Sequence, residues 1–179
     1  LIADGRIDVV MLAGRHSLLE QGAIDTVLAP AAAAGISVIA VGVYNSGLLA
    51  SDRPAPDATY DYLPAPTELL ARANRIADVC EAYGVTLPVA ALAFAGLHPS
   101  VAGVALGMRS GEQVRENLRR AATTVPPTLW DALISAELIP ENSVTTSISS
   151  TTREREAARC DLCRYERATR AFPVSPSAT

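Results

Sequence analysis

One segment of the chain combines residue types that could hold a phosphate group. It runs from Leu106 to Asn117 and reads LGMRSGEQVREN. Ser110 and Gln113 have the spacing of a capping box, in which a serine begins a helix and glutamine follows three residues later. A helix that begins here points free N–H groups and the positive end of its dipole toward an anion. Arg109, directly before the serine, adds a side chain that can donate two hydrogen bonds to a phosphate.

The same helix is expected to carry a polar face. Gln113, Glu116 and Asn117 stand at i, i+3 and i+4, and these positions share one side of an α-helix. Amide and carboxylate groups in this arrangement could hydrogen-bond a planar base. An ordinary capped helix with a solvated polar face explains the spacing as well, and on spacing alone we favour that interpretation because capping boxes are common.

Apolar runs alternate with helical patterns along the first 140 residues. Gly35 and Gly84 are natural helix ends, and four prolines between Ser51 and Pro66 predict a long loop there. The alternation predicts an α/β fold with parallel strands. The expected strands are 7–12, 36–43 and 101–106. The expected helices are 23–34, which Pro30 breaks or restarts, 69–83, 88–97, 111–121 and one that begins near Pro127.

Three parallel strands are too few to form a complete fold of this class. Their apolar faces need covering on both sides, and a closed barrel takes roughly 250 residues. The chain has 179 residues and begins with Leu1 rather than methionine, so we expect a piece of a longer protein. Open strand edges and uncovered faces also predict poor solubility for the isolated chain.

Composition excludes several classes of function. All 15 basic residues are arginine, which excludes Schiff-base chemistry and a P-loop lysine. A net charge of −4 with 4% aromatic residues argues against a nucleic-acid partner. We expect no membrane span, no signal peptide and a cytoplasmic protein. Cys80 stands alone, and the pair Cys160 and Cys163 lacks the further ligands that a zinc site needs.

The amino-acid composition of the chain changes near its end. Residues 1–141 are expected to form the folded domain, whereas residues 142–179 are rich in serine and threonine and then in arginine. This tail is expected to be disordered, or helical only around 153–167. A basic arm for a polyanion is the less favoured alternative, because acidic residues are interleaved with the arginines.

Three segments resemble the aldo/keto reductase family. Gly107–Asn117 is similar to its nucleotide-binding segment, which typically reads G-A-R-S-x-x-Q-x-x-E-N. Met11–Gln21 and Gly42–Leu49 resemble segments of its sugar-dehydrogenase branch, which includes L-fucose, D-threo-aldose and pyridoxal 4-dehydrogenases, and 58–66 fits the same branch. The motifs occur in the right order, and the resemblance covers about residues 1–140. The tail does not match.

The resemblance implies an NAD(P)-dependent oxidoreductase on a (β/α)8 TIM barrel, of which this chain supplies the last three strands and their helices. The parent enzyme would oxidise an aldose at C1 to a lactone. Its partners would be a nicotinamide dinucleotide and a small sugar or aldehyde, with no metal. By resemblance, 107–110 approach the adenosine ribose and its phosphate, and the polar helix face meets adenine. The implied cofactor-binding residues are Gly42, Tyr44, Ser46, Gly47, Leu48, Gly107, Met108, Arg109, Ser110, Gln113, Glu116 and Asn117.

The sequence departs from the family pattern around the cofactor. Many members place a tyrosine under the nicotinamide ring, and the matching stretch of this chain is Val-Gly-Val at 41–43. Either no aromatic side chain stacks on the ring, or Tyr44 stacks on it from a shifted position. Members that prefer the phosphorylated cofactor carry lysine and arginine where this chain has Gly107 and Gln113. NAD is therefore slightly favoured, although Arg109 could hold a 2′-phosphate. Met108 is larger than the usual alanine and would crowd that phosphate.

The family's catalytic tyrosine, lysine, aspartate and histidine belong to the first half of the barrel. No catalytic residue is therefore expected here, and the isolated chain is predicted to be inactive. Arg15 and His16 follow a strand and are tentative substrate contacts, with a surface or packing role as the alternative. His98 is expected to be structural. A non-enzymatic nucleotide-binding or interaction module and a truncated gene product remain alternative interpretations.

Overall fold

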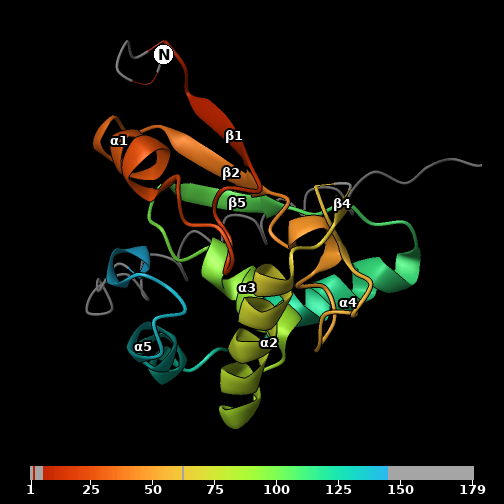
Figure 1. The fold of residues 1–179 in the computed structure, drawn as a ribbon. Coiled ribbons are helices and arrows are strands. Elements are labelled where there is room, and N and C mark those ends of the chain that lie inside the picture. Colours follow the sequence, from red (N-terminus) through yellow and green to blue (C-terminus); the bar gives the residue numbers. More distant parts are fainter. Residues whose placement is uncertain (1, 3–5, 62, 145–179) are drawn as a thin grey trace, which may run out of the picture. The chain divides into compact units, whose positions relative to one another are not determined.

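The structure is a computed structural model that describes residue 2 and residues 6–61 and 63–144. These residues belong to one compact unit, residues 1–145 (Figure 1). The expectations for the tail beyond 144 and for Cys160 and Cys163 lie outside the described residues.

A three-stranded parallel sheet forms where the apolar runs predicted it. Its strands are β1 (Val9–Ala13), β2 (Ser37–Val41) and β5 (Val101–Ala105), in the order β1-β2-β5 (Figure 1). The register pairs Met11 with Ile39, and a shift after Val38 brings Ile39 opposite Gly103. All three carboxyl ends therefore lie at one edge of the sheet.

Helices follow each strand. Gly84, with φ +67, follows the end of the longest helix, and Pro88 lies in the first turn of the next one. The helices are α1 (Ala29–Ala33), α2 (Thr67–Ala82), α3 (Leu87–Ala95), α4 (Gly111–Ala122) and α5 (Pro127–Ser135). Helices α2, α3 and α5 enclose the largest apolar core together with Leu18, Leu19, Leu48 and Leu49 from two loops.

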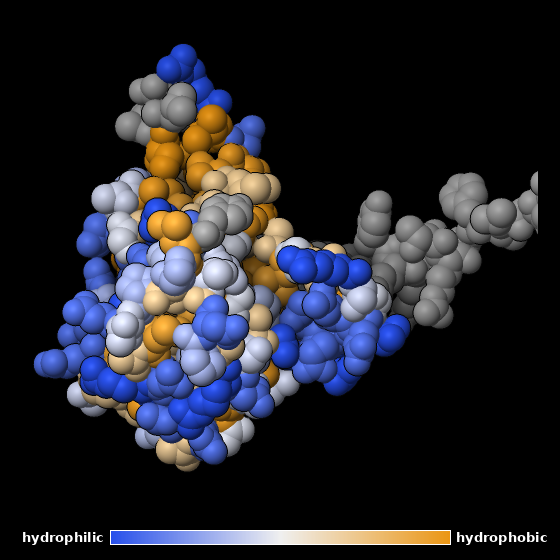
Figure 2. All heavy atoms as spheres, turned by 45° about the vertical axis from the view of Figure 1, so that its right-hand side comes forward, coloured by the Kyte–Doolittle hydropathy of each residue, from blue (hydrophilic) through white to orange (hydrophobic). Residues whose placement is uncertain are grey.

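The two faces of the sheet differ. Val10, Leu12 and Val38 pack under α1, while Ala40 packs against α3. The opposite face is open, because Val9 is 55% exposed and Met11 is 69% exposed. Figure 2 shows hydrophobic side chains gathered in the upper part of the view, where Figure 1 places β1. The three-stranded sheet is open and does not close into a barrel, as expected.

The structure corrects one expectation for local structure and refines another. The stretch 51–66 is not only a loop, because it contains the short hairpin β3 (Thr59–Tyr60) and β4 (Leu63–Pro64). The helical stretch 23–34 restarts near Pro30 as expected, since α1 begins at Ala29 with this proline in its first turn, but the part before it, Ile24–Leu28, is a π-helical turn. Proline at that position needs no N–H partner, so the restart is placed there.

Within the described residues, no single helix has the length and apolar composition needed to cross a bilayer; α2 and α3 pass that test only jointly, across a 98° bend. In the same part of the chain, no group of three or more histidine, cysteine, aspartate or glutamate side chains is placed to hold a metal ion.

Candidate nucleotide-binding site

The site lies where the chain leaves β2 and β5. At this edge β1 and β2 approach closely, since a Cβ on Gly42 would lie 3.2 Å from the backbone nitrogen of Gly14. Gly42 also has φ +69, which disfavours other residues. The Gly14 N–H donates to the carbonyl of Val41 at 2.8 Å, which fixes the start of the loop.

A cavity of about 600 Å³ lies between the loop after β2 and the start of α4. Its volume is in the range of small-molecule sites. It is lined by Gly42, Val43, Tyr44, Asn45, Ser46, Gly47, Ala50, Ala105, Leu106, Gly107, Met108, Arg109 and Gln113.

The loop after β2 adopts an unusual backbone. Asn45 and Ser46 have φ values of 47° and 57°, in the left-handed region that non-glycine residues seldom adopt, and Gly47 follows with φ 99°. Asn45 is only 3% exposed, and its Oδ1 has no hydrogen-bond partner among the described residues. Ser46 Oγ accepts a hydrogen bond from the Asp61 N–H at 3.2 Å, which links the loop to the hairpin. Strain of this kind is often found at functional sites.

The capping box that the sequence predicted is present at the start of α4. Ser110 Oγ accepts from the Gln113 N–H at 3.2 Å. Gln113 Oε1 accepts in return from the Arg109 N–H at 2.7 Å, one residue before the cap. The N–H groups of Gly111 and Glu112 then lack intrahelical acceptors, as in every helix start. The Arg109 side chain is exposed and makes no ion pair within the described residues, so it is free to meet a phosphate.

A polar network connects the loop after β2 with α4. Tyr44 Oη donates to Asn117 Oδ1 at 3.2 Å. Arg120 Nη1 donates to the same oxygen at 3.2 Å, and Arg120 Nε lies 3.3 Å from Glu116 Oε1. Arg119 pairs with the other oxygen of Glu116. Burial raises the pKa of the Tyr44 hydroxyl above its ordinary value.

The structure brings most of the expected cofactor residues to the cavity. Eight of the twelve line it: Gly42, Tyr44, Ser46, Gly47, Gly107, Met108, Arg109 and Gln113. Leu48 is 1% exposed and packs in the main core instead, because the chain turns inward after Gly47. Ser110, Glu116 and Asn117 do not line the cavity. Asn45 also lines the cavity although it was not predicted; its signal in the sequence was its place between two predicted contacts, Tyr44 and Ser46.

The two tentative substrate contacts lie after β1. Arg15 is exposed, whereas His16 is 2% exposed and its ring centroid lies 5.3 Å from that of Phe94. Burial first, and then the neighbouring His98, lower the pKa of His16 from 6.5 to about 4, and the Ala95 backbone offsets only part of this. Substrate contact by these residues stays a prediction. His98 is buried and shares a 2.8 Å hydrogen bond with Ser100 Oγ, in keeping with a structural role.

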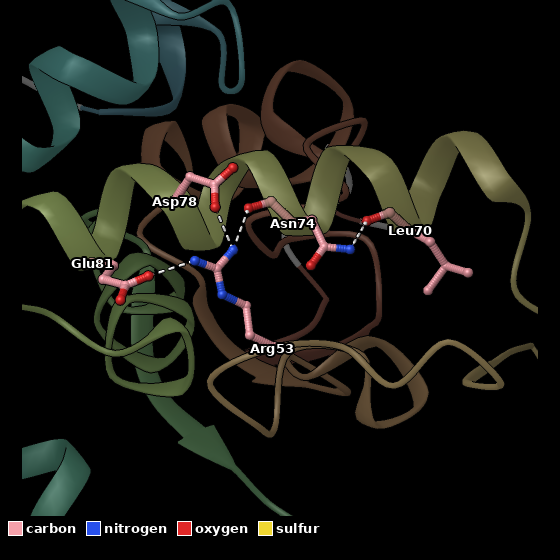
Figure 3. A network of polar contacts seen from close by, with 5 residues as sticks. All are labelled: Arg53, Leu70, Asn74, Asp78 and Glu81. Carbon is pink, nitrogen blue, oxygen red and sulfur yellow. Dashed lines mark hydrogen bonds and ion pairs between the residues drawn. The ribbon is translucent and has the colours of Figure 1, made fainter.

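Arg53, in the proline-rich stretch 51–66, binds to side chains and a carbonyl of α2. Arg53 forms ion pairs with Asp78 and Glu81 and donates to the carbonyl of Asn74 at 3.3 Å (Figure 3). All three partners lie on one side of α2, and the guanidinium reaches them from the neighbouring loop. The start of the loop that follows the cavity residues is thereby tied to a helix of the main core.

Comparison with known proteins agrees with this arrangement. The family model described as "Aldo/keto reductase family" matches residues 2–136. The chain is 38% identical to pyridoxal 4-dehydrogenase of Microbacterium luteolum over 138 residues, which is 77% of this chain and 40% of that protein. It is 39% identical to D-threo-aldose 1-dehydrogenase of a Pseudomonas species over 139 residues, covering 78% and 42% of the two chains. The chain thus spans about two fifths of these relatives.

Solved structures show the same fold. An aldo-keto reductase of Bacillus halodurans in its holo form superposes with a TM-score of 0.57 at 23% identity, over 79% of this chain and 46% of that one. The glycerol dehydrogenase of Gluconobacter oxydans gives 0.53 at 15% identity, over 79% and 46%. The expected fold class, part of a (β/α)8 barrel, is confirmed. The chain belongs to the aldo/keto reductase family.

Proposed function

We propose that this chain is the cofactor-binding part of an NAD(P)-dependent oxidoreductase. The observation that carries the proposal is the cavity of about 600 Å³ at the carboxyl ends of β2 and β5, bounded by the capped start of α4. Barrel enzymes bind their ligands at this end of the strands. The helix start with free Arg109 suits a phosphate, and the loop 44–47 lines the part of the cavity where the remainder of a dinucleotide would lie.

The parent reaction we infer is the oxidation of an aldose at C1 to a lactone. The cofactor, when bound, supplies the acceptor for the hydride that leaves C1, and the hydroxyl proton passes to a base. The chain contains no lysine, so it does not supply the set of tyrosine, lysine, aspartate and histidine that the family uses. Its own residues bind and orient the cofactor, and we expect no turnover from these 179 residues alone. Arg15 is the residue we assign to the substrate side, because it is exposed and follows the carboxyl end of β1.

NAD is the cofactor we favour. Gly107 and Gln113 offer no positive charge, and the Gln113 carbonyl oxygen is already occupied by the Arg109 N–H. Arg109 is then the one cavity-lining cation among the described residues. Met108 also lines the cavity, and its side chain, which is larger than the alanine usual in the family, would crowd a 2′-phosphate.

Calorimetric titration of the purified chain with NAD+ and NADP+ tests the proposal. Trp130 is 4% exposed and packs against Phe94, so its near-ultraviolet dichroism reports whether the chain is folded. We expect saturable binding that Arg109→Ala weakens about tenfold, while Arg75→Ala, which removes the same charge from α2, has no effect. A folded chain that binds neither dinucleotide would contradict the proposal. Equal losses in the two variants would show nonspecific charge attraction.

A further inference from the structure

The open face of the sheet carries side chains in rows that cross the strands. Residues paired in register point to the same face of a parallel sheet. Two rows cross all three strands on the open face: Met11 with Ile39 and Gly103, and, nearer the carboxyl ends, Ala13 with Val41 and Ala105. None of these residues has a polar side chain, and Met11 is 69% exposed. The open face is therefore a continuous apolar surface.

The two rows differ in the size of their side chains. Met11 and Ile39 are bulky, whereas Gly103 leaves space: a Cβ there would have only Ile39 Cδ1 within 4 Å, at 3.7 Å. The second row holds only alanine and valine, and its Ala105 lines the cavity described above. The bulky row with its gap at Gly103 thus suits packing against further side chains, and the small row belongs to the floor of the cavity.

Helix α4 presents a second uncovered apolar surface. Val114 and Leu118 lie four residues apart on one side of the helix and are 39% and 65% exposed. No residue of α4 is buried, whereas nearly all residues of α3, against which α4 packs, are buried. Because α4 follows β5, this surface lies beyond one edge strand of the sheet, and the exposed Val9 and Met11 belong to the other edge strand, β1.

We propose that the open face of the sheet and the Val114–Leu118 side of α4 together form a docking surface for a wall of parallel strands with their helices. The occupant is the kind of wall that the relatives carry outside the part matched here. That part is 40% of pyridoxal 4-dehydrogenase, which leaves about three fifths of that protein. Eight strands close such a barrel, and this chain supplies three, so the wall contains about five.

The position of the two surfaces separates this occupant from smaller ones. A single helix or peptide covers the sheet or α4 but does not reach both, because they flank opposite edges of the sheet. A second copy of this chain adds only three strands, and the resulting six leave edges that remain unpaired. A wall that joins the free edge of β1 to the free edge of β5 pairs both edges and covers both apolar surfaces.

Co-expression with a tagged fragment tests the proposal. The fragment is the part of pyridoxal 4-dehydrogenase of Microbacterium luteolum that this chain does not match. We expect the fragment to capture the chain in a complex that sediments as one copy of each. The positive control is capture of the relative's own matching part by the same fragment.

A matched pair of variants locates the contact. Met11→Asp places a carboxylate on the open face, and we expect capture to weaken at least about tenfold, since the charge is buried without a partner on docking. Leu63→Asp makes a similar change on the hairpin, at a residue that is 68% exposed, and should be captured as well as the unmodified chain. Leu118→Asp should weaken capture by about threefold, because it lies at the margin of the surface.

The methionine methyl signals give a readout on the face itself. The chain contains two methionines, Met11 and Met108. In the free chain a soluble nitroxide should broaden the Met11 methyl signal strongly, because that side chain is exposed. In the complex with the fragment the same signal should be protected.

The outcomes are distinct from those for the proposed function. If the fragment captures its own counterpart but not this chain, or if Met11→Asp and Leu63→Asp are captured equally well, the docking surface is overturned. A discrete dimer of the chain alone that Met11→Asp dissociates would also overturn it, because a second copy then covers the face. A chain that binds NAD+ but not the fragment leaves the proposed function intact, and a folded chain that is captured but binds no dinucleotide contradicts only the proposed function.

Discussion

The loops after β1 and β2 leave neighbouring parallel strands at the same edge of the sheet, yet they place their polar side chains in opposite surroundings. After β1 the chain turns inward, and His16, Leu18 and Leu19 are all at most 2% exposed. After β2 the chain lines the cavity with Tyr44 and Ser46 before it returns to the core at 48–49. Position at a strand end therefore does not by itself make a polar residue available to a ligand.

The largest difference between the two loops should be in stability. Leu18 is 0% exposed, and we expect Leu18→Ala to lower the free energy of unfolding by about 3 kcal/mol, through lost burial and the cavity left behind. Ser46→Ala, in the exposed part of the other loop, should cost no more than about 0.5 kcal/mol. Urea denaturation measures both, and similar losses would contradict the contrast.

The second prediction concerns the loss of stability at acidic pH. The pKa of His16 falls from 6.5 to about 4 on folding, so the unfolded chain takes up the proton first. The stability that neutral His16 contributes is fully present above about pH 6.5 and is lost as the pH falls toward 4. At about pH 5 the free energy of unfolding should be lower by about 2 kcal/mol. His98, which faces His16 from beyond α3, has its pKa lowered by burial and adds to the same trend.

The matched control for the acid effect is His16→Phe. It keeps an aromatic ring against Phe94 and removes the titrating group. The carboxylates of the protein titrate in both chains, so the difference between the two unfolding curves isolates His16. An unchanged pH dependence in His16→Phe would mean that His16 is not held neutral in the core.

The third prediction returns to the ligand side. Ser110→Ala removes the acceptor for the Gln113 N–H, and we expect a loss of about 1 kcal/mol in the free energy of unfolding. Ser110→Asp should retain the cap, because aspartate is an equally good acceptor at this position. If both variants lose the same amount in urea denaturation, the cap does not stabilise the start of α4.

The smallest effect should come from Arg53. Its pairs with Asp78 and Glu81 are exposed, and such pairs contribute little and are screened by salt. Arg53→Gln should leave the unfolding midpoint nearly unchanged at high salt and lower it slightly at low salt. A large loss that is independent of salt would mean that the loop is fastened by more than charge.

Much of the fold followed from local patterns in the sequence. Apolar β-branched runs defined the three strands, and Gly111 begins its helix where the capping box predicted. The hairpin at 59–64 was missed because prolines at 64 and 66 mark a loop, although two-residue strands tolerate a proline at an edge. The π-helical turn at 24–28 has no sequence signature of comparable strength.

The site was predicted in part. The glycines and Arg109 were found from the motif, but the burial of His16 and Leu48 depends on helices that come much later in the chain. The bond from Tyr44 to Asn117 spans 73 positions, and only the tertiary fold brings them together. The local spacing of residue types does not reveal contacts between residues so far apart in the sequence.

The most direct measurement of the central claim is a map of backbone amide shifts while NAD+ is added to the chain. We expect the shifts to concentrate in 42–50 and 107–113, the two segments that bound the cavity, with little change in the buried stretch 16–19. Shifts centred on 16–19, or spread evenly over the chain, would contradict a dinucleotide site between the loop after β2 and the start of α4.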